Sequence, residues 1–542
     1  MIRPLAATLL AASLLLSACT TVPSSRPSSW SAPEVLVAPS SFTGVHGLAV
    51  DKQGRLLAGS VVGSSLWEVN RQTGAARVMV PAPEGQADDI AVGAKGELAW
   101  TNYMVGMIRY RENDAAPLRI LAKDLPGINS LDFDRRNGKL YASQVFLGDA
   151  LWEIDVAGQQ APRLIKKDLG GFNGFEVGPD GMLYGPLWFK GQVVKINPAS
   201  GDVTVINSEF KTPAAANLDG KGNLWVIDTK TGELSRVELA TGRKTVAKQL
   251  KPALDNLAIA PDGTIYVSNM ADNSIEAFNP VTGVLTLVTG GKVAVPAGLK
   301  VEGNDLWVAD VFGFRNVNTQ TGAVKDIFRM QASDMEYPFA VGVSATHFAL
   351  TSWFTGTVQM VERSTLKTSA MLHGLKAPFD AIPMADGSVV YAEIATGSIT
   401  RASGAQWADR KVIAQGLAGP VQMVLGKDGA LYVTEAAGKL VRVNMADGSK
   451  TTVVEGLSLP EGVAQTPWGS FIVAESAAKR LVEIDPANGT RRTVADNLPI
   501  GMPGGAGMPP PYVVTGVAVG ADGSIYMSAD LNNAIYRIRP QR

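Results

Sequence analysis

The 542-residue chain has little cysteine, little histidine and almost no net charge, and each shortage excludes a class of function. Its single Cys rules out a disulfide framework and any site built from several cysteine ligands. Three His are too few for a histidine-rich metal centre. Because 49 Lys and Arg stand against 50 Asp and Glu, no basic field exists for a phosphate backbone. We therefore expect no nucleic-acid partner.

A sustained helical period is also missing, and twelve copies of one short pattern take its place. Each copy resembles 256-NLAIAPDGTIYVSN, with an apolar strand, a turn glycine and a second strand. The turn glycine advances from Gly54 to Gly523 in eleven steps, which is about 43 residues a step. Four short strands with their turns fill that length. The repeat therefore predicts four-stranded β-propeller blades.

Twelve blades predict an all-β chain of two tandem six-bladed β-propellers, because rings mostly carry 4–8 blades. Seven plus five blades is the alternative partition. An unpaired strand, 34–38, precedes the first repeat and can supply an outer strand. In the preferred arrangement it opens the first ring, 34–282, and strand 284–290 opens the second ring, 283–542. The alternative sends strand 34–38 across to the last blade.

The N-terminal segment is typical of an export signal. Residues 1–18 carry Arg3 followed by an apolar stretch that is too short to span a bilayer of about 30 Å comfortably. The sequence Leu-Ser-Ala-Cys at 16–19 resembles a bacterial lipobox, and Cys19 is the only Cys of the chain. We expect a lipoprotein signal peptide, a lipid on Cys19, a flexible tether over 19–33, and an outer-membrane protein that faces the periplasm or cell surface. The alternative is an ordinary secretory signal.

The first strand of each blade lines the central channel of a propeller, so the residue before or at its start lies at the channel mouth. In the first ring these residues are mostly polar, and in the second mostly apolar. The first-ring set is His46, Asp88, Asn129, Asn173, Ala214 and Asp255. Converging oxygen ligands suit a hard cation, so Asp88, Asn129, Asn173 and Asp255 are candidate ligands of Ca²⁺ or Mg²⁺. The alternative is that they bond backbone amides at strand starts.

The repeats resemble the group of six-bladed propellers that holds the gluconolactonase/regucalcin, NHL-repeat, strictosidine-synthase-like and virginiamycin B lyase-like proteins. The likeness covers about residues 34–540. It implies a divalent cation in the channel, and Asn173-Gly174 resembles the Asn-bearing blade start of the gluconolactonases. The early Glu-x-Pro-x-Trp motif of that family is absent, and His46 stands in that blade. We predict His46 and Asp255 as catalytic residues; the alternative for His46 is a structural hydrogen bond.

Aromatic residues gather in the loops expected at the same mouths. Tyr103, Trp188, Phe189 and Trp353 are the candidate substrate-binding residues, and Phe146, Phe312, Phe314 and Phe354 accompany them. Packing between blades is the alternative. A Gly/Pro-rich insertion, 499–514, interrupts the period and is a candidate lid or partner contact.

Together these features favour a cell-envelope lipoprotein whose propellers bind a small organic molecule or a glycan. The leading hypothesis makes the first ring a divalent-metal-dependent hydrolase, similar to lactonases, or a lyase. The alternative is a non-catalytic scaffold whose faces bind proteins or glycans. Contact with a membrane is expected through the N-terminal lipid only.

Overall fold

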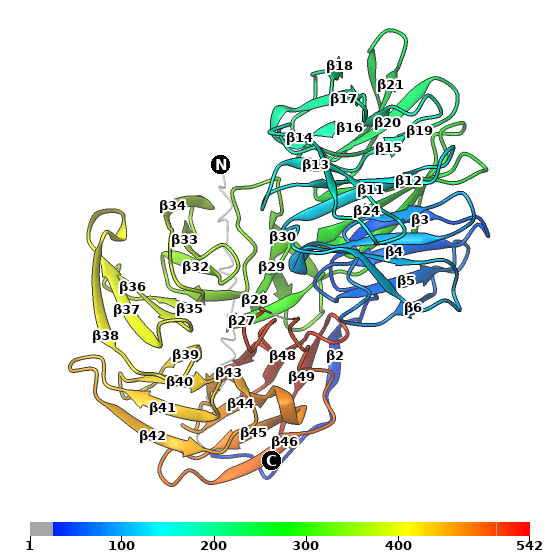
Figure 1. The fold of residues 1–542 in the computed structure, drawn as a ribbon. Coiled ribbons are helices and arrows are strands. Elements are labelled where there is room, and N and C mark those ends of the chain that lie inside the picture. Colours follow the sequence, from blue (N-terminus) through cyan, green and yellow to red (C-terminus); the bar gives the residue numbers. More distant parts are fainter. Residues whose placement is uncertain (1–24, 506) are drawn as a thin grey trace, which may run out of the picture.

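The computed structural model of the chain describes residues 25–505 and 507–542, and it is all-β. Twelve four-stranded antiparallel sheets form two rings of six, which confirms the predicted pair of six-bladed propellers. Figure 1 shows the first ring in blue to green and the second in green to red. Signal segment 1–18 and Cys19 lie outside the described residues.

Each blade of the first ring is formed by four consecutive strands, in order from the channel outward. The strands are β3 (Val45–Val50), β4 (Leu56–Ser60), β5 (Ser65–Val69) and β6 (Ala76–Val80); β7 (Ile90–Val92), β8 (Leu98–Asn102), β9 (Met107–Arg111) and β10 (Arg119–Ala122); β11 (Ile128–Asp134), β12 (Lys139–Gln144), β13 (Ala150–Ile154) and β14 (Arg163–Lys167); β15 (Glu176–Val177), β16 (Leu183–Leu187), β17 (Gln192–Ile196) and β18 (Val203–Asn207); β19 (Pro213–Leu218), β20 (Asn223–Asp228), β21 (Glu233–Glu238) and β22 (Lys244–Gln249); β23 (Leu254–Ile259), β24 (Ile265–Asn269), β25 (Ser274–Phe278) and β26 (Leu285–Thr289).

The second ring has five blades of the same kind and a sixth of mixed origin. Its strands are β27 (Pro296–Glu302), β28 (Asp305–Asp310), β29 (Gly313–Asn318) and β30 (Val324–Arg329); β31 (Ala340–Val343), β32 (His347–Ser352), β33 (Thr357–Glu362) and β34 (Lys367–Leu372); β35 (Pro378–Pro383), β36 (Val389–Glu393), β37 (Ser398–Ser403) and β38 (Asp409–Ala414); β39 (Pro420–Leu425), β40 (Leu431–Glu435), β41 (Lys439–Val443) and β42 (Lys450–Glu455); β43 (Pro460–Gln465), β44 (Phe471–Glu475), β45 (Arg480–Ile484) and β46 (Arg491–Ala495); β47 (Val517–Val519), β48 (Ile525–Ala529), β49 (Ala534–Ile538) and β2 (Glu34–Val37).

The closure of the rings corrects the preferred arrangement of the sequence analysis. Strand β2 pairs with β49 in the last blade, where Glu34 lies opposite Arg537, and β26 is the outer strand of the first ring's own sixth blade. The alternative that sends strand 34–38 to the last blade is therefore correct. The boundary falls at 290–295 and not at 283. The chain thus starts in the second ring, builds the whole first ring, and then returns, so two connections join the rings (Figure 1).

The predicted flexible tether is wrong for its described part. Strand β1 (Ser29–Trp30) pairs with β50 (Pro540–Gln541) in a two-stranded sheet. Arg26 Nε lies 3.0 Å from a carboxylate oxygen of Glu483, and the Trp30 ring lies 5.9 Å from that of Trp468. This segment is held against the second ring by an ion pair and an aromatic contact. A Ser/Pro-rich composition does not reveal such contacts.

Burial follows the position of a strand within its blade. The second strands, such as β4 and β8, are buried along their whole length, because neighbouring blades cover both of their faces. The outer strand β18 is exposed over most of its length. The predicted turn glycines adopt the left-handed backbone that such turns need, with φ of +76° at Gly54 and +87° at Gly523.

A shared apolar core and a buried ion pair hold the two rings together. Val62 and Met270 of the first ring share one cluster of buried side chains with Phe312 and Phe339 of the second. The guanidinium of Arg329 donates to both carboxylate oxygens of Asp272 at 2.9 Å. The rings are therefore packed against one another along a built interface.

One buried amide links three parts of the chain at this interface. The Asn273 Oδ1 accepts from the backbone amides of Gly44 and Val45 at 2.8 and 3.2 Å. Its Nδ2 donates to the carbonyl of Ala294, in the connection between the rings, at 2.7 Å. The start of the first ring and its exit therefore share one side chain.

The described part of the chain has five short 3-10 helices, each of which follows a strand: η1 (Tyr103–Val105), η2 (Trp188–Lys190), η3 (Met270–Asp272), η4 (Ala405–Trp407) and η5 (Ser476–Ala478). Among the residues that the structure describes, no helix has the length and apolar character to cross a bilayer.

Candidate functional site

A cavity of about 290 Å³ lies where the channel mouth of the first ring faces the second ring. Five of the six predicted blade-start residues line it, namely His46, Asp88, Asn129, Asn173 and Asp255. They converge because every first strand runs toward the same mouth of the ring. The predicted convergence of these residues is therefore present in the structure.

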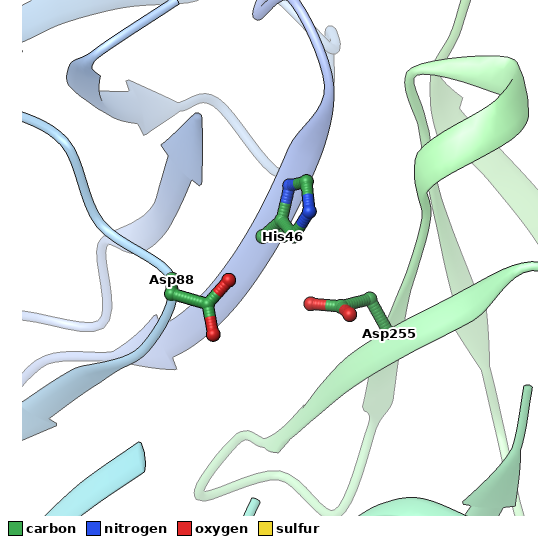
Figure 2. A group of neighbouring side chains, drawn as sticks. All are labelled: His46, Asp88 and Asp255. Atoms are coloured by element: carbon green, nitrogen blue, oxygen red, sulfur yellow. The ribbon is translucent and has the colours of Figure 1, made fainter. Parts of the chain in front are cut away.

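Three of these side chains form the tightest group. His46 on β3, Asp88 just before β7 and Asp255 on β23 each offer one ligand atom, and these atoms lie within 4.8 Å of one another. The blades of Asp88 and Asp255 flank the blade of His46, so the three come from adjacent positions on the ring. Figure 2 shows the two carboxylates pointing toward one another beside the imidazole.

Neighbouring carboxylates at the channel differ from this pair in their contacts. Asp89 accepts from the amide of Leu131 at 3.2 Å, and Asp132 accepts from the amide of Val177 at 2.8 Å. Both therefore connect one blade to the next. Within the described residues, the side chains of Asp88 and Asp255 accept no hydrogen bond from a backbone amide. The strand-start interpretation thus fits Asp89 and Asp132, and it does not fit Asp88 and Asp255.

Burial shifts the protonation of the pair. It raises the pKa of Asp255 to about 7. The pKa of Asp88 is raised well above its usual range by burial and by the nearby charges of Asp255 and Asp89. Asp88 and Asp255 are the only acids on the described wall of the cavity, and no Lys or Arg lies there. The pair therefore needs a proton or a cation to balance its charge.

The imidazole of His46 is held in one tautomer. Its Nδ1 lies 2.9 Å from the carbonyl oxygen of Gly44, which only accepts, so Nδ1 carries the proton and Nε2 keeps its lone pair. Burial lowers the pKa of His46 to about 4, so the ring is neutral at neutral pH. A backbone carbonyl behind one nitrogen is the usual support of a metal-binding imidazole.

The two predicted asparagine ligands are engaged differently from the acids. The Ser130 hydroxyl lies 2.8 Å from Asn129 Oδ1 and 2.9 Å from Asn173 Oδ1. The amide of Gly174 also donates to Asn173 Oδ1 at 2.9 Å. The single hydroxyl hydrogen of Ser130 is thus shared between the two carboxamide oxygens, each of which keeps further acceptor capacity. Asn129 and Asn173 line the cavity, and their role as ligands stays a prediction.

The aromatic residues divide according to their distance from this cavity. Tyr103, Trp188 and Trp353 line it, while Phe189 lies outside the lining and its side chain is 60% exposed. Tyr103 and Trp188 begin η1 and η2, directly after the second strands of their blades. Trp353 comes from the second ring, where it follows β32.

Sequence analysis missed several residues of the second ring that complete the wall. Tyr337 and Phe339 lie in the loop before β31, and Tyr512 lies in the 499–514 insertion. Trp353 Nε1 donates to the carbonyl of Tyr512 at 3.1 Å, which fixes the insertion against the wall. The interrupted repeat period marked the insertion, but no pattern in the sequence indicated that the second ring covers the first ring's mouth.

Two buried acids of the second ring have structural roles. Glu461 of the second channel accepts from the amide of Thr515, and Asp530 accepts from the amides of Gly501 and Met502. Asp530 therefore anchors the start of the insertion.

No protein-family model matches the chain, and no curated protein matches it either. Among solved structures, the extracellular domain of the one component system protein BT4673 from B. thetaiotaomicron is 11% identical, with a TM-score of 0.34, over 92% of this chain and 76% of that one. A streptogramin B lyase is 16% identical, with a TM-score of 0.27, over 60% and 93% of the two chains. Virginiamycin B lyase from Staphylococcus aureus is 15% identical, with a TM-score of 0.26, over 60% and 94%.

Proposed function

We propose that the protein binds a small organic ligand in the cavity between its rings, beside a divalent cation held by Asp88, Asp255 and His46. The observation that carries this proposal is the pair of carboxylates that hold no backbone amide and face an imidazole with a free lone pair. Two acids without a basic neighbour attract a cation. A ligand set of one imidazole and two carboxylates suits Mn²⁺ or Zn²⁺ better than Ca²⁺, which prefers oxygen ligands only.

A cation at this position would polarise a ligand carbonyl and lower the pKa of a bound water, which is the chemistry of lactone or ester hydrolysis. The residues of the chain supply the rest of the site. Asn129 supports the charged form of Asp88 through its side chain, Gly44 orients His46, and the aromatic wall excludes water. These roles support a hydrolase function of the first ring over that of a scaffold without a ligand.

Titration calorimetry with Ca²⁺, Mg²⁺, Mn²⁺ and Zn²⁺ tests the cation. We expect wild type to bind at least one of them, and Asp255→Asn to weaken binding by about tenfold or more, because one ligand charge is lost. Asp262→Asn is the matched control, since Asp262 lies in the exposed turn after β23 and caps the amide of Thr264. Absence of binding by all four cations to wild type would contradict the proposal.

Turnover of a lactone and ester panel, measured with and without a chelator, tests the activity separately. Hydrolysis that survives complete removal of the cation, or that persists in Asp255→Asn and Asp88→Asn, would show that this site does not perform it.

We also propose that the protein is a lipoprotein of the cell envelope, anchored through Cys19. The lipobox at 16–19 supports this assignment. Cys19→Ser should release the protein from the membrane fraction or leave its signal segment uncleaved. Unchanged membrane fractionation of the variant would contradict the anchor.

A further inference from the structure

The wall of the cavity that faces the acids comes from the second ring and is aromatic. The Trp353 ring lies 5.1 Å from Phe339 and 5.9 Å from Phe354, between ring centroids. Tyr337 continues the row, at 5.5 Å from Phe354 and 6.1 Å from Phe312. These rings pack edge to face or tilted, so they form one continuous surface.

Charge on the lining is of one sign. Asp88 and Asp255 stand at the first-ring end, and the described lining holds neither Lys nor Arg. A carboxylate, phosphate or sulfonate on a ligand is normally met by such a residue. Without a cation, an anionic group would meet two acids and an apolar wall, where repulsion and desolvation both oppose its entry. A divalent cation would only cancel the charge of the two carboxylates, so the lining has no surplus positive charge for an anion in either state.

The outer rim of the cavity is apolar and conformationally unusual. Phe146 and Leu147 line the cavity, yet their side chains are 46% and 55% exposed. Phe146 adopts φ of +68°, a left-handed backbone that is uncommon for a bulky residue. Its ring meets Trp188 edge to face at 5.3 Å. Strain that presents an aromatic side chain at a mouth is typical of a binding site.

From these three observations we infer that the ligand is a compact, uncharged aromatic or other apolar compound. Its apolar body lies on the second-ring wall of Phe312, Trp353 and Phe354, and its one polar end, an oxygen, faces His46, Asp88 and Asp255. Only that polar end rests on the function proposed above. We expect a polyhydroxylated sugar to bind more weakly than an apolar ring of the same size, because the polar groups of the first ring can meet its hydroxyl groups at one end only.

Two fluorescent probes that share one ring system test the inference. N-phenyl-1-naphthylamine is neutral, and 1-anilinonaphthalene-8-sulfonate adds a sulfonate to the same rings. With a chelator present, we expect saturable binding of the neutral probe and affinity at least about tenfold weaker for the sulfonate. D-glucono-1,5-lactone should not displace the neutral probe. Sulfonate binding that equals or exceeds neutral binding, or displacement by the sugar lactone, would overturn the inference.

Variants place the probe in this cavity. Trp353→Ala should weaken binding of the neutral probe by about tenfold, and Phe354→Ala by a smaller factor, because each removes part of the wall. Phe354 is only partly buried, and its removal breaks no hydrogen bond, whereas the removal of Trp353 breaks the bond to the carbonyl of Tyr512. Phe354→Ala is therefore a second test should Trp353→Ala fail to fold. Trp407→Ala is the control, since its indole bonds the carbonyl of Gly387 away from the cavity.

Binding that neither wall variant changes would overturn the inference. Because the chelator is present throughout, loss of the cation proposal leaves this test intact. Conversely, cation binding without probe binding would overturn the ligand class and leave the cation site standing.

Discussion

The imidazole of His46, in the first ring, lies edge-on to the phenyl ring of Phe312, in the second, with 5.4 Å between their centroids. The polar end and the aromatic wall of the cavity therefore meet at one contact. Each ring supplies half of the site, so the proposed ligand contacts both propellers at once. The tandem arrangement thus defines the cavity, beyond merely linking two domains.

The close approach of Phe312 depends on Gly44. A Cβ at Gly44 would lie 2.5 Å from Phe312 Cε2, and Gly44 has φ of +73°. Gly283 has nearly the same φ, +70°, with open space around it. We expect Gly44→Ala to lose about 1–2 kcal/mol more unfolding free energy than Gly283→Ala, because only the former displaces a packed ring. Equal losses of unfolding free energy for the two variants in urea denaturation would show that the Phe312 ring moves aside without an energetic cost.

The acid pair predicts a pH-dependent stability of the cation-free protein. The pKa of Asp255 is about 7 in the folded state, above its ordinary 3.8, so the native state keeps a proton that the unfolded chain releases. The Asp255 carboxyl by itself therefore lowers stability as pH rises from about 4 to about 7. His46, whose folded pKa of about 4 lies below its ordinary 6.5, acts in the opposite direction over much of that range, so the comparison of wild type with Asp255→Asn isolates the acid. At pH 8, Asp255→Asn should be more stable than wild type by about 2 kcal/mol, and the difference should vanish toward pH 4.

Asp89→Asn is the matched control for that experiment. The Asp89 carboxylate accepts from the amides of Ile90 and Leu131 and from Asn256 Nδ2. Burial raises the pKa of Asp89 to about 7 as well, so both variants remove a raised acid. Only Asp89→Asn also weakens these three bonds, so it should be less stable at pH 8 than Asp255→Asn by about 1–2 kcal/mol. Destabilisation of both variants alike at pH 8 would show that Asp255 also has a structural partner.

The ion pair between the rings, Arg329 with Asp272, should contribute more to the unfolding free energy than an ion pair on the surface. Arg329 and Asp272 are largely buried, and Arg329→Met leaves the Asp272 carboxylate with only the longer contacts to Lys251 and Arg315, at 3.6 and 3.8 Å, so it should cost about 2–3 kcal/mol. Arg243 and Glu238 form an exposed pair that water screens, so Arg243→Met should hardly change the unfolding free energy. Similar values for the two variants would mean that the pair of Arg329 and Asp272 adds no stability to the interface.

The closure of the second ring by β2 can be checked within one strand. Val37 is 1% exposed and Val35 is 50% exposed. Val37→Ala should cost about 2 kcal/mol, because a cavity opens in the last blade, whereas Val35→Ala should stay within about 0.5 kcal/mol. A larger effect at Val35 would contradict the pairing of β2 with β49.

Much of this fold followed from the sequence, because each repeat specifies its own blade through local turns and strand patterns. The blade starts then placed His46, Asp88 and Asp255 at one mouth by periodicity alone. The partner of strand 34–38 could not be predicted, since every outer strand has the same pattern and either closure satisfies the count. The contact between His46 and Phe312 was equally hidden, because packing between rings leaves no period in the sequence.

The docked segment that precedes β2 has a consequence for how far the protein reaches. Arg26 is paired with Glu483, and Arg492 donates to the carbonyl of Pro27 at 2.8 Å, so only seven Cα steps separate Cys19 from a fixed point on the second ring. Seven steps span at most about 25 Å. With a lipid on Cys19, as we propose, the connecting segment is short, and the fifth blade of the second ring stays close to the bilayer. The protein would then sample only solutes in the thin layer beside its own membrane.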